Sequence, residues 1–266
     1  MDLGTLIGLV IGLGMILGGN LLEGGKISQI LQPTAAMIVF GGTIGATMIQ
    51  FPLRTFLRAM KAAKTVLIEP KNQAAKLIED IVGFATIARK DGIVALEGLI
   101  PETTHPFLRR ALMMAVDGAD SAAMRSALET SISQSEEEGE DIAKVYETAG
   151  GYAPTIGIIG AVLGLIQVMS HLSDIEKVGE GIATAFVATI YGVGFANIIC
   201  LPLGGKLKLR NREAIAVREI MLEGALAIQE GMNPKLVRER LSTLAQEAEA
   251  ELVAAERDRP QEKAAA

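Results

Sequence analysis

The sequence predicts an all-α membrane protein with four transmembrane helices arranged as two hairpins. Half of the 266 residues are hydrophobic, yet only 4% are aromatic and tryptophan is absent. That balance does not suit a single aromatic-rich soluble core. Four long runs lack Asp, Glu, Lys and Arg altogether, and the segments between them have helical apolar spacing with little strand signal.

The four uncharged runs are each long enough to cross a bilayer. They are residues 3–22, 27–53, 148–173 and 181–205. Because an α-helix rises about 1.5 Å per residue, roughly 20 residues cross a hydrocarbon core of about 30 Å. The first run is expected to be a retained helix, because Asp2 stands where a secretory signal would carry Lys or Arg. The expected spans are 3–22, 32–52, 154–173 and 182–203.

Basic residues near the span ends set the expected orientation. Short loops rich in Lys and Arg stay on the cytoplasmic side of the membrane. The two short connections, 23–26 and 174–180, contain only Lys26 and Lys177 as basic residues. We therefore expect both termini and the long middle segment to be cytoplasmic. The basic residues that follow the second and fourth spans are Arg54, Arg58, Lys61, Lys64, Lys206, Lys208, Arg210, Arg212 and Arg218.

This organisation divides the chain into four segments. They are a transmembrane hairpin at 1–53, a cytoplasmic helical domain at 54–150, a second hairpin at 151–205 and a cytoplasmic helical tail at 206–266. A basic amphipathic helix is expected to leave the membrane after span two and to stop near Pro70. The tail should break at Gly231 and Pro234 and fray over RDRPQEKAAA, residues 257–266. Further α-helices are expected at 72–90, 93–100, 106–117, 121–149, 207–230 and 235–256.

The sequence favours neither an enzyme nor a metal protein. The single cysteine, Cys200, falls inside the fourth run, so one chain can form no disulfide, and we interpret it as a small packing residue. His105 and His171 have no neighbouring residues that would complete a metal site. The glycine-rich stretch GGTIGA at 41–46 lies in the middle of a span and cannot serve as a phosphate loop. No cofactor, metal or nucleic-acid partner is expected.

Glycines on the spans predict close helix contacts, because small residues let backbones approach in lipid. Packing within the chain explains most of them, and the additional glycines of the third span suggest a partner helix. The glycines are Gly4, Gly8 and Gly12 on span one, Gly41 and Gly45 on span two, and Gly157, Gly160 and Gly164 on span three.

Polar residues on the third and fourth spans are candidates for the lining of an ion path. Each one alone has a second explanation, since a hydroxyl in a helix can bond the carbonyl four residues earlier. Pro154 and Pro202 lie at the cytoplasmic edges of these spans, where a proline frees a backbone carbonyl and favours a bend. The polar residues are Thr155, Gln167, Ser170, Thr184, Thr189, Tyr191 and Asn197.

Several stretches carry a resemblance to a known family. They are FGGTIGA at 40–46, YAPTIGIIGAVLGLIQVM at 152–169, GIATAFVATIYGVGFANIICLPLGGKLK at 181–208 and EIMLEGALAIQEGMNPKLVRERL at 219–241. Together they resemble the MotA family of bacterial flagellar stator proteins, within the wider MotA/TolQ/ExbB group. The resemblance extends from the first span to about residue 245, and the last stretch is typical of the flagellar branch.

The resemblance implies a stator subunit of the bacterial inner membrane that couples ion flow to torque. It implies a homopentamer around two copies of a MotB-type single-span protein, whose helix carries the ion-binding aspartate. Ion flow would turn the pentamer in the membrane lipid, and the cytoplasmic domain would drive the rotor through the switch protein FliG.

The stretch ARKDGIVALE at 88–97 matches the family motif for the rotor contact. The resemblance places the two oppositely charged positions at Arg89 and Glu97, with Lys90 beside them. Eight residues on a helix turn through about 80° over two turns, so both charges are expected to face one partner. The alternative is a solvated charge pair.

The resemblance also assigns the ion path. The family's prolines correspond to Pro154 and Pro202, its ion-path threonine corresponds to Thr189, and Thr34 matches a second threonine of sodium-driven members. A third sodium-type threonine would fall at Ala161. Losing that hydroxyl removes an oxygen ligand from a hard cation, which favours protons over sodium. Thr155 and Thr184 complete the expected lining.

Three other classes of function remain as alternatives. A self-contained transporter would need its own ionisable site within the membrane, which the four runs lack. A membrane scaffold would not need the hydroxyls and prolines of spans three and four. An ExbB/TolQ-like or other stator-like energiser of a non-flagellar envelope machine would keep the same chemistry and change only the load.

Overall fold

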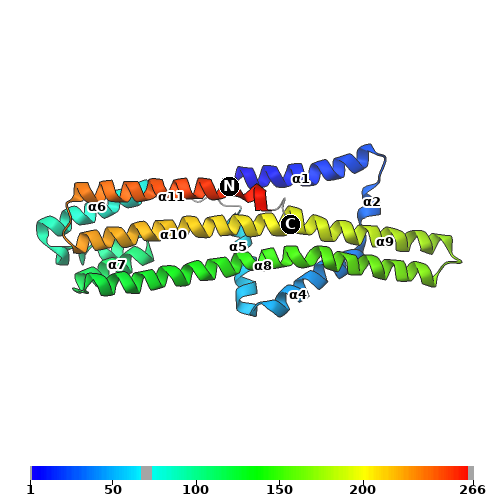
Figure 1. The fold of residues 1–266 in the computed structure, drawn as a ribbon, viewed down its shortest axis with the longest axis horizontal. Helices are drawn as coiled ribbons and strands as arrows, with labels where there is room; N and C mark the ends of the chain where they lie inside the picture. The colour runs from blue at the N-terminus through cyan, green and yellow to red at the C-terminus, as the bar shows by residue number, and fades with distance from the viewer. Residues whose placement is uncertain (1, 67–73, 263–266) are drawn as a thin grey trace. The chain divides into compact units, whose positions relative to one another are not determined.

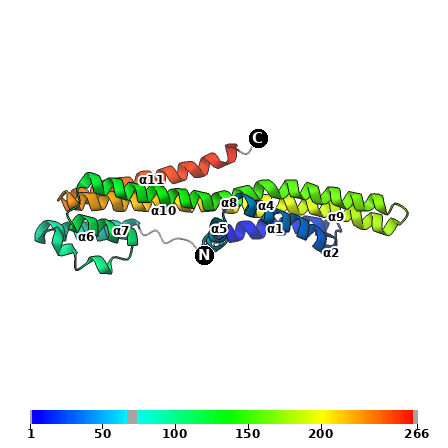
Figure 2. The same cartoon turned by 90° about the horizontal axis from the view of Figure 1, so that it is seen from below.

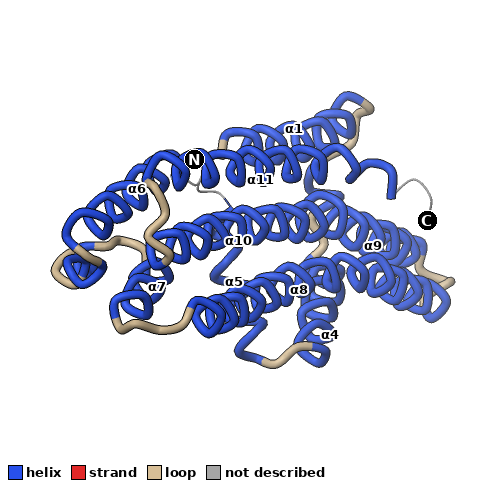
Figure 3. The backbone as a smooth tube through the Cα atoms, turned by 60° about the vertical axis from the view of Figure 1, so that its left-hand side comes forward, coloured by secondary structure: helices blue, strands red, loops and turns tan. Residues whose placement is uncertain are grey.

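The protein is all-helical, as predicted. The structure, a computed structural model, describes residues 2–66 and 74–262, and within these residues it contains helices and turns but no strand (Figures 1 and 3). The chain forms two compact units. Unit 1 comprises residues 1–69 and 139–208, and unit 2 comprises residues 70–138 and 209–266. Two long helices, α8 and α10, contribute to both units.

Unit 1 begins with α1 (Leu3–Leu22). None of the residues of this helix is buried in the single chain. Asp2 caps this helix by accepting a hydrogen bond from the Thr5 backbone N–H at 3.0 Å. The Asp2 carboxylate also pairs with Lys206 at 2.7 Å. The Lys206 ammonium, followed by the Thr5 N–H, lowers the pKa of Asp2 to about 2. The start of α1 is therefore held by an ion pair to Lys206, the first residue after the fourth uncharged run.

The span expected at 32–52 forms one uninterrupted helical stretch over residues 33–50, which consists of α3 (Pro33–Ala36), a π-helix η1 (Met37–Gly41) and α4 (Gly42–Gln50). A short helix, α2 (Ile27–Ile30), precedes it in the same uncharged run. Among the described residues three helical stretches are long and apolar enough to cross a membrane: Leu3–Leu22, Ser121–Ser170 and Ile175–Gln229. The 33–50 stretch is not one of them, because glycines, threonines and a terminal glutamine lower its hydropathy.

The third and fourth spans are parts of longer helices. The helices expected at 121–149 and 154–173 are one helix, α8 (Ser121–Ser170), which continues through Pro154. A proline has a helical φ and removes only one backbone hydrogen bond, so a well-packed helix can contain it. The fourth span is likewise continuous: α9 (Ile175–Gly194), a π-helix η4 (Phe195–Cys200) and α10 (Leu201–Gln229) follow without a break. The tail helix expected from residue 207 thus begins inside the span.

A short helix, α5 (Leu53–Val66), leaves the second uncharged run. It crosses α8 at a steep angle instead of running along it (Figures 1 and 2). The Tyr146 hydroxyl on α8 donates to the Ala59 carbonyl at 2.9 Å. Ala59 and Val66 pack with Leu207 in a small apolar cluster. The expected stop near Pro70 lies outside the described residues.

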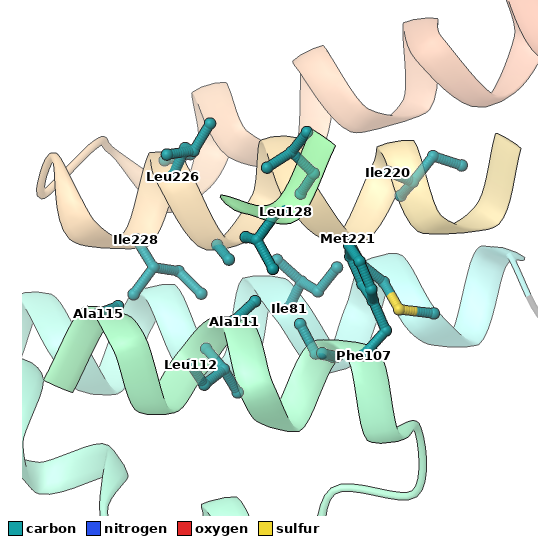
Figure 4. Close-up of a cluster of buried hydrophobic side chains, with 14 of the residues drawn as sticks. Ile81, Phe107, Ala111, Leu112, Ala115, Leu128, Ile220, Met221, Leu226 and Ile228 are labelled. Atoms are coloured by element: carbon teal, nitrogen blue, oxygen red, sulfur yellow. The ribbon is translucent and has the colours of Figure 1, made fainter. Parts of the chain in front are cut away.

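Unit 2 is a helical domain with its own apolar core. Its remaining elements are α6 (Ala74–Asp91), η2 (Ile93–Leu96), η3 (Ile100–Glu102), α7 (Pro106–Val116) and α11 (Pro234–Glu262). Figure 4 shows the core, to which Ile81 of α6, Leu112 of α7 and Met221 of α10 belong. All three side chains are fully buried. The helices expected at 72–90 and 106–117 are confirmed within about two residues.

Two expectations for unit 2 are wrong. The α-helix expected at 93–100 is replaced by the 3-10 turns η2 and η3, because Gly92 ends α6 with φ 88°. The final helix extends to Glu262, past the expected end at residue 256, while residues 263–266 of the stretch expected to fray lie outside the described residues. The break between α10 and α11 is as expected, since Gly231 has φ 65° and α11 begins at Pro234.

Candidate functional site

The centre of unit 1 is a tight antiparallel pair formed by α8 and α9. A methyl group added to Gly164 would lie 2.9 Å from the Gly181 carbonyl oxygen. One added to Gly157 would lie 3.0 Å from the Ala188 carbonyl oxygen, and one added to Gly160 would lie 2.8 Å from the Ala188 methyl. The backbones touch because these positions have no side chain.

The glycines of the third span therefore pack within the chain, and the prediction that their surplus marks a partner helix is wrong. The open glycines lie elsewhere. A methyl group on Gly8, Gly41 or Gly45 would meet nothing within 4 Å, and one on Gly4 would meet only the Asp2 side chain. A methyl group on Gly12 would lie 3.9 Å from the Ile198 side chain. Small-residue surfaces on α1, η1 and α4 thus remain uncovered in the single chain.

Three of the threonines proposed for the ion path bond to a carbonyl of their own helix. Thr189 donates to the Ala185 carbonyl at 3.2 Å, and Thr184 donates to the Glu180 carbonyl at 2.9 Å. Thr155 donates to the Tyr152 carbonyl, three residues back, at 2.8 Å. The second explanation offered in the sequence analysis is thus realised for these three hydroxyls. Each oxygen still has lone pairs that can accept from water or bind a cation.

The expected lining residues differ in exposure. Pro154, Ala161 and Thr189 are half-buried, as is Thr184. Thr34 on α3, Thr155 on α8 and Pro202 at the start of α10 are exposed in the single chain. All seven belong to unit 1.

Tyr191 has a structural role that its sequence position did not reveal. Its hydroxyl donates to the Ile30 carbonyl at 2.6 Å and accepts from the Gln32 backbone N–H at 3.3 Å. Its ring stacks on Phe40 at a centroid distance of 5.6 Å, and Phe40 meets Phe195 edge-on at 5.1 Å. Tyr191 thus ties the irregular segment before α3 to α9.

Two π-helices meet at this aromatic cluster. Phe40 belongs to η1 and Phe195 to η4, so the two irregular segments contact each other. A π-helix widens the turn and often occurs at functional sites. The π-helix η4 ends two residues before Pro202. Cys200 is buried at the end of η4, which confirms its interpretation as a packing residue.

The predicted rotor-contact residues lie on unit 2. Arg89 and Lys90 are exposed in the last turn of α6, and Glu97 is exposed after η2. The expectation that Arg89 and Glu97 share one helix is wrong, because the positive φ of Gly92 separates them. Leu96 is fully buried and fixes the turn to the core. The three charges therefore sit on a structured turn, not on one helical face.

The described residues offer no metal centre. No group of three or more His, Cys, Asp or Glu side chains among them is arranged to hold an ion. His105 lies at the N-cap of α7, where burial, and then the nearby Arg218, lower the pKa of its imidazole.

Comparison with known proteins places this arrangement in a family. The motility protein A N-terminal model matches residues 6–91, and the MotA/TolQ/ExbB proton channel family model matches residues 100–220. Motility protein A of Helicobacter pylori is 36% identical over 241 residues, covering 91% of this chain and 94% of that protein. Motility protein A of Bacillus subtilis is 33% identical over 242 residues, covering 91% and 90%.

The chain belongs to the motility protein A family. Its fold agrees with that of family members of known structure. A chain in the C. jejuni MotAB structure matches with a TM-score of 0.86 and 31% identity, covering 92% of this chain and 96% of that one. A chain of the flagellar MotAB stator complex from Bacillus subtilis matches with a TM-score of 0.81 and 33% identity, covering 89% and 93%. The family resemblance predicted from the sequence is confirmed, and the family is one of stator ion channels, not of known enzymes.

Proposed function

We propose that this flagellar stator subunit provides most of the wall of a proton path and that a second protein provides the proton-binding group. One observation carries the proposal. The helices α8, α9 and α10 carry prolines and hydroxyls in unit 1, yet residues 3–22, 27–53, 148–173 and 181–205 contain no Asp, Glu, Lys or Arg. Such a wall cannot hold a proton by itself.

The missing carboxylate is supplied in this proposal by a MotB-type single-span partner. Two homologous chains of known structure come from MotAB complexes, which supports this choice. A lone charge at the bilayer centre costs about 2.5–3.5 kcal/mol or more, so a carboxylate there needs shielding. Five copies of this chain around two partner helices would surround it. Each proton would release about 2.3 kcal/mol per 100 mV of membrane potential.

The load in this proposal is the flagellar rotor. Arg89, Lys90 and Glu97 are exposed on the turn that closes α6, where they would contact the switch protein FliG. The match of residues 6–91 to the motility protein A N-terminal model supports this load. The alternative of an ExbB/TolQ-like envelope energiser is not favoured, because the curated relatives over nine-tenths of the chain include motility proteins and PomA.

The proposed membrane arrangement has four spans, with the 33–50 stretch as the second. Both termini and unit 2 lie in the cytoplasm of a bacterial inner membrane. The two short connections at 23–26 and 174–180 lie outside. The basic residues that follow the second and fourth uncharged runs support this orientation.

Cysteine labelling tests the orientation. Glu23 and Lys177 are exposed in the outer connections, and Lys90 and Glu239 are exposed in unit 2. In a Cys200→Ala background, Glu23→Cys and Lys177→Cys should react with an impermeant thiol reagent added to intact cells. Lys90→Cys and Glu239→Cys should react only after the cells are broken. Labelling of Lys90→Cys in intact cells would rule out the rotor contact.

The proposed ion is the proton. Ala161 stands at the position where a sodium path would have a threonine, so the hydroxyl that would bind sodium is missing there. Swimming speed should follow the pH gradient and stay unchanged when sodium is replaced by potassium at fixed pH. An Ala161→Ser variant serves as the matched comparison, since it adds one oxygen at the same place. Speed that rises with sodium concentration in the unaltered protein would contradict the assignment.

A further inference from the structure

The backbone is not helical between α2 and α3, inside the second uncharged run. α2 ends at Ile30 and α3 begins at Pro33, and the two residues between them are extended, with ψ 90° at Leu31 and ψ 100° at Gln32. The carbonyl of Ile30 and the N–H of Gln32 therefore lie outside the regular hydrogen-bond pattern of either helix. In the hydrocarbon region of a membrane, such backbone groups need a partner from elsewhere in the protein.

The hydroxyl of Tyr191 on α9 is the partner of both backbone groups. It donates to the Ile30 carbonyl at 2.6 Å and accepts from the Gln32 N–H at 3.3 Å. A phenolic hydroxyl has one proton to donate and lone pairs to accept with, so a single side chain can satisfy both groups. The hydroxyl of Tyr191 is thus committed to the break between α2 and α3.

This contact lies at nearly the same level of α9 as Thr189. Tyr191 follows Thr189 by two residues and precedes Lys206, the first residue after the fourth uncharged run, by 15 residues. These separations correspond to rises of about 3 Å and roughly 22 Å along a helix. Because a hydrocarbon core is about 30 Å thick, Tyr191 and Thr189 lie in the outer half of the bilayer in the proposed membrane arrangement.

Tyr191 also holds the other end of α3, which is a single turn between two irregular segments. The break precedes this turn, and the π-helix η1 follows it. Ala35 of α3 is fully buried in a cluster with Val187 of α9, while its neighbour Thr34 is exposed. The ring of Tyr191 stacks on Phe40 of η1 at a centroid distance of 5.6 Å. The hydroxyl therefore anchors the chain before α3, and the ring anchors it after α3.

We infer, on the basis of the proposed proton path, that Tyr191 is a positioning residue for that path. It fixes α3 against α9 and so keeps Thr34 in the wall at the level of Thr189. Thr34 is the lining residue nearest to the outer connection at 23–26, so its place affects how readily a proton enters from outside. Loss of the Tyr191 hydroxyl should therefore raise the external proton concentration that the path needs, without changing its maximal rate.

Tyr191→Phe removes only the hydroxyl and keeps the ring that stacks on Phe40. The chain and its MotB-type partner in an open form are reconstituted in liposomes, and proton flux is measured against external pH at a fixed membrane potential. We expect half-maximal flux of the variant at an external pH lower by about one unit. This shift is a roughly tenfold higher proton concentration and corresponds to about 1.4 kcal/mol. The midpoint does not depend on the amount of protein, so a lower yield of the variant would not hide the shift.

Tyr152→Phe is the matched control, since it removes the same group from another tyrosine of unit 1. The Tyr152 hydroxyl donates to the Gln50 side chain at 2.7 Å, at the end of α4 that is proposed to face the cytoplasm. This variant should conduct with the same midpoint and the same maximal flux as the unaltered complex. A midpoint shifted equally in both variants would show that the position of Tyr191 has no special role.

Hydrogen exchange tests the anchoring of the break without any ion flow. The Gln32 N–H is bonded to Tyr191, so Tyr191→Phe should speed its exchange on the order of tenfold, while Tyr152→Phe should leave it unchanged. The measurement is mass spectrometry of the segment that contains Gln32 in the reconstituted chain.

Three results would overturn the inference. An unchanged midpoint in Tyr191→Phe would remove its role in proton entry. A lower maximal flux at an unchanged midpoint would assign the hydroxyl to folding alone. Unchanged exchange at Gln32 would show that the hydroxyl does not anchor the break. Absence of flux in the unaltered complex is a different failure, because it would contradict the proposed proton path itself.

Discussion

Gly192→Ala should prevent the α8–α9 pair from forming and should abolish motility. The new methyl group would lie 2.5 Å from the Ala153 carbonyl oxygen, 3.1 Å from the Gly157 Cα and 3.2 Å from the Pro154 Cα. All three atoms belong to the backbone, so no side-chain rotation can relieve the contact. Overpacking of this kind typically costs about 1–3 kcal/mol. The measurement is the yield and thermal midpoint of the detergent-solubilised protein.

Gly194→Ala is the matched control, two residues further along the same chain. A methyl group there would meet nothing within 4 Å. Alanine is also a better helix former than glycine by roughly 1 kcal/mol. The control should therefore retain the yield and thermal midpoint of the unaltered protein or exceed them. Equal losses in both variants would show that helix flexibility, and not the close contact, explains the glycine at position 192.

Reversal of either rotor-contact charge, Arg89→Glu or Glu97→Lys, should stop swimming while the membrane complex remains assembled. Both side chains are exposed, so the fold does not need them. Truncating one member of a hydrogen-bonded pair buried in an interface costs about 2–5 kcal/mol, and about 2 kcal/mol alone weakens binding roughly thirty-fold. The measurement is swimming speed beside the amount of complex in the membrane.

Two comparisons separate a contact from a solvated pair. A compensating charge reversal on the rotor protein should restore swimming, and Lys76→Glu, which reverses another exposed charge of unit 2, should leave it unaffected. Exposed pairs are worth under about 1 kcal/mol, so a purely solvated pair would show almost no effect. A loss of complex equal to the loss of motility would assign the charges to folding instead.

The helical class could be predicted because charge and hydrophobicity act locally. A run such as 3–22 needs only length and the absence of charge to become a helix, and α1 spans those residues. The same reasoning found the break between α10 and α11, where Gly231 and Pro234 act on their own backbone. It also predicts a helix end near Lys90, where α6 ends at Asp91 and Gly92 has φ 88°.

The pairing of helices could not be predicted in the same way. A glycine in a span indicates that another backbone approaches closely, but not which one, so the sequence alone does not show that Gly164 meets Gly181. The hydrogen bond from Tyr191 to Ile30 joins residues 161 positions apart, and no local pattern reveals it. The functional assignments of Arg89 and Thr189 depended on the family resemblance, since their own surroundings fit a solvated charge and an ordinary helix-bonded hydroxyl equally well.

Proton flux in liposomes tests the central claim most directly, namely that this chain forms a path that conducts only when a partner supplies the carboxylate. The chain is reconstituted alone, with its MotB-type partner in an open form, and with a partner whose intramembrane Asp is replaced by Asn. A potassium gradient sets the membrane potential, and an internal dye reports pH. Our account predicts flux only with the intact partner. Proton flux through this chain alone, or with the Asn partner, would contradict it.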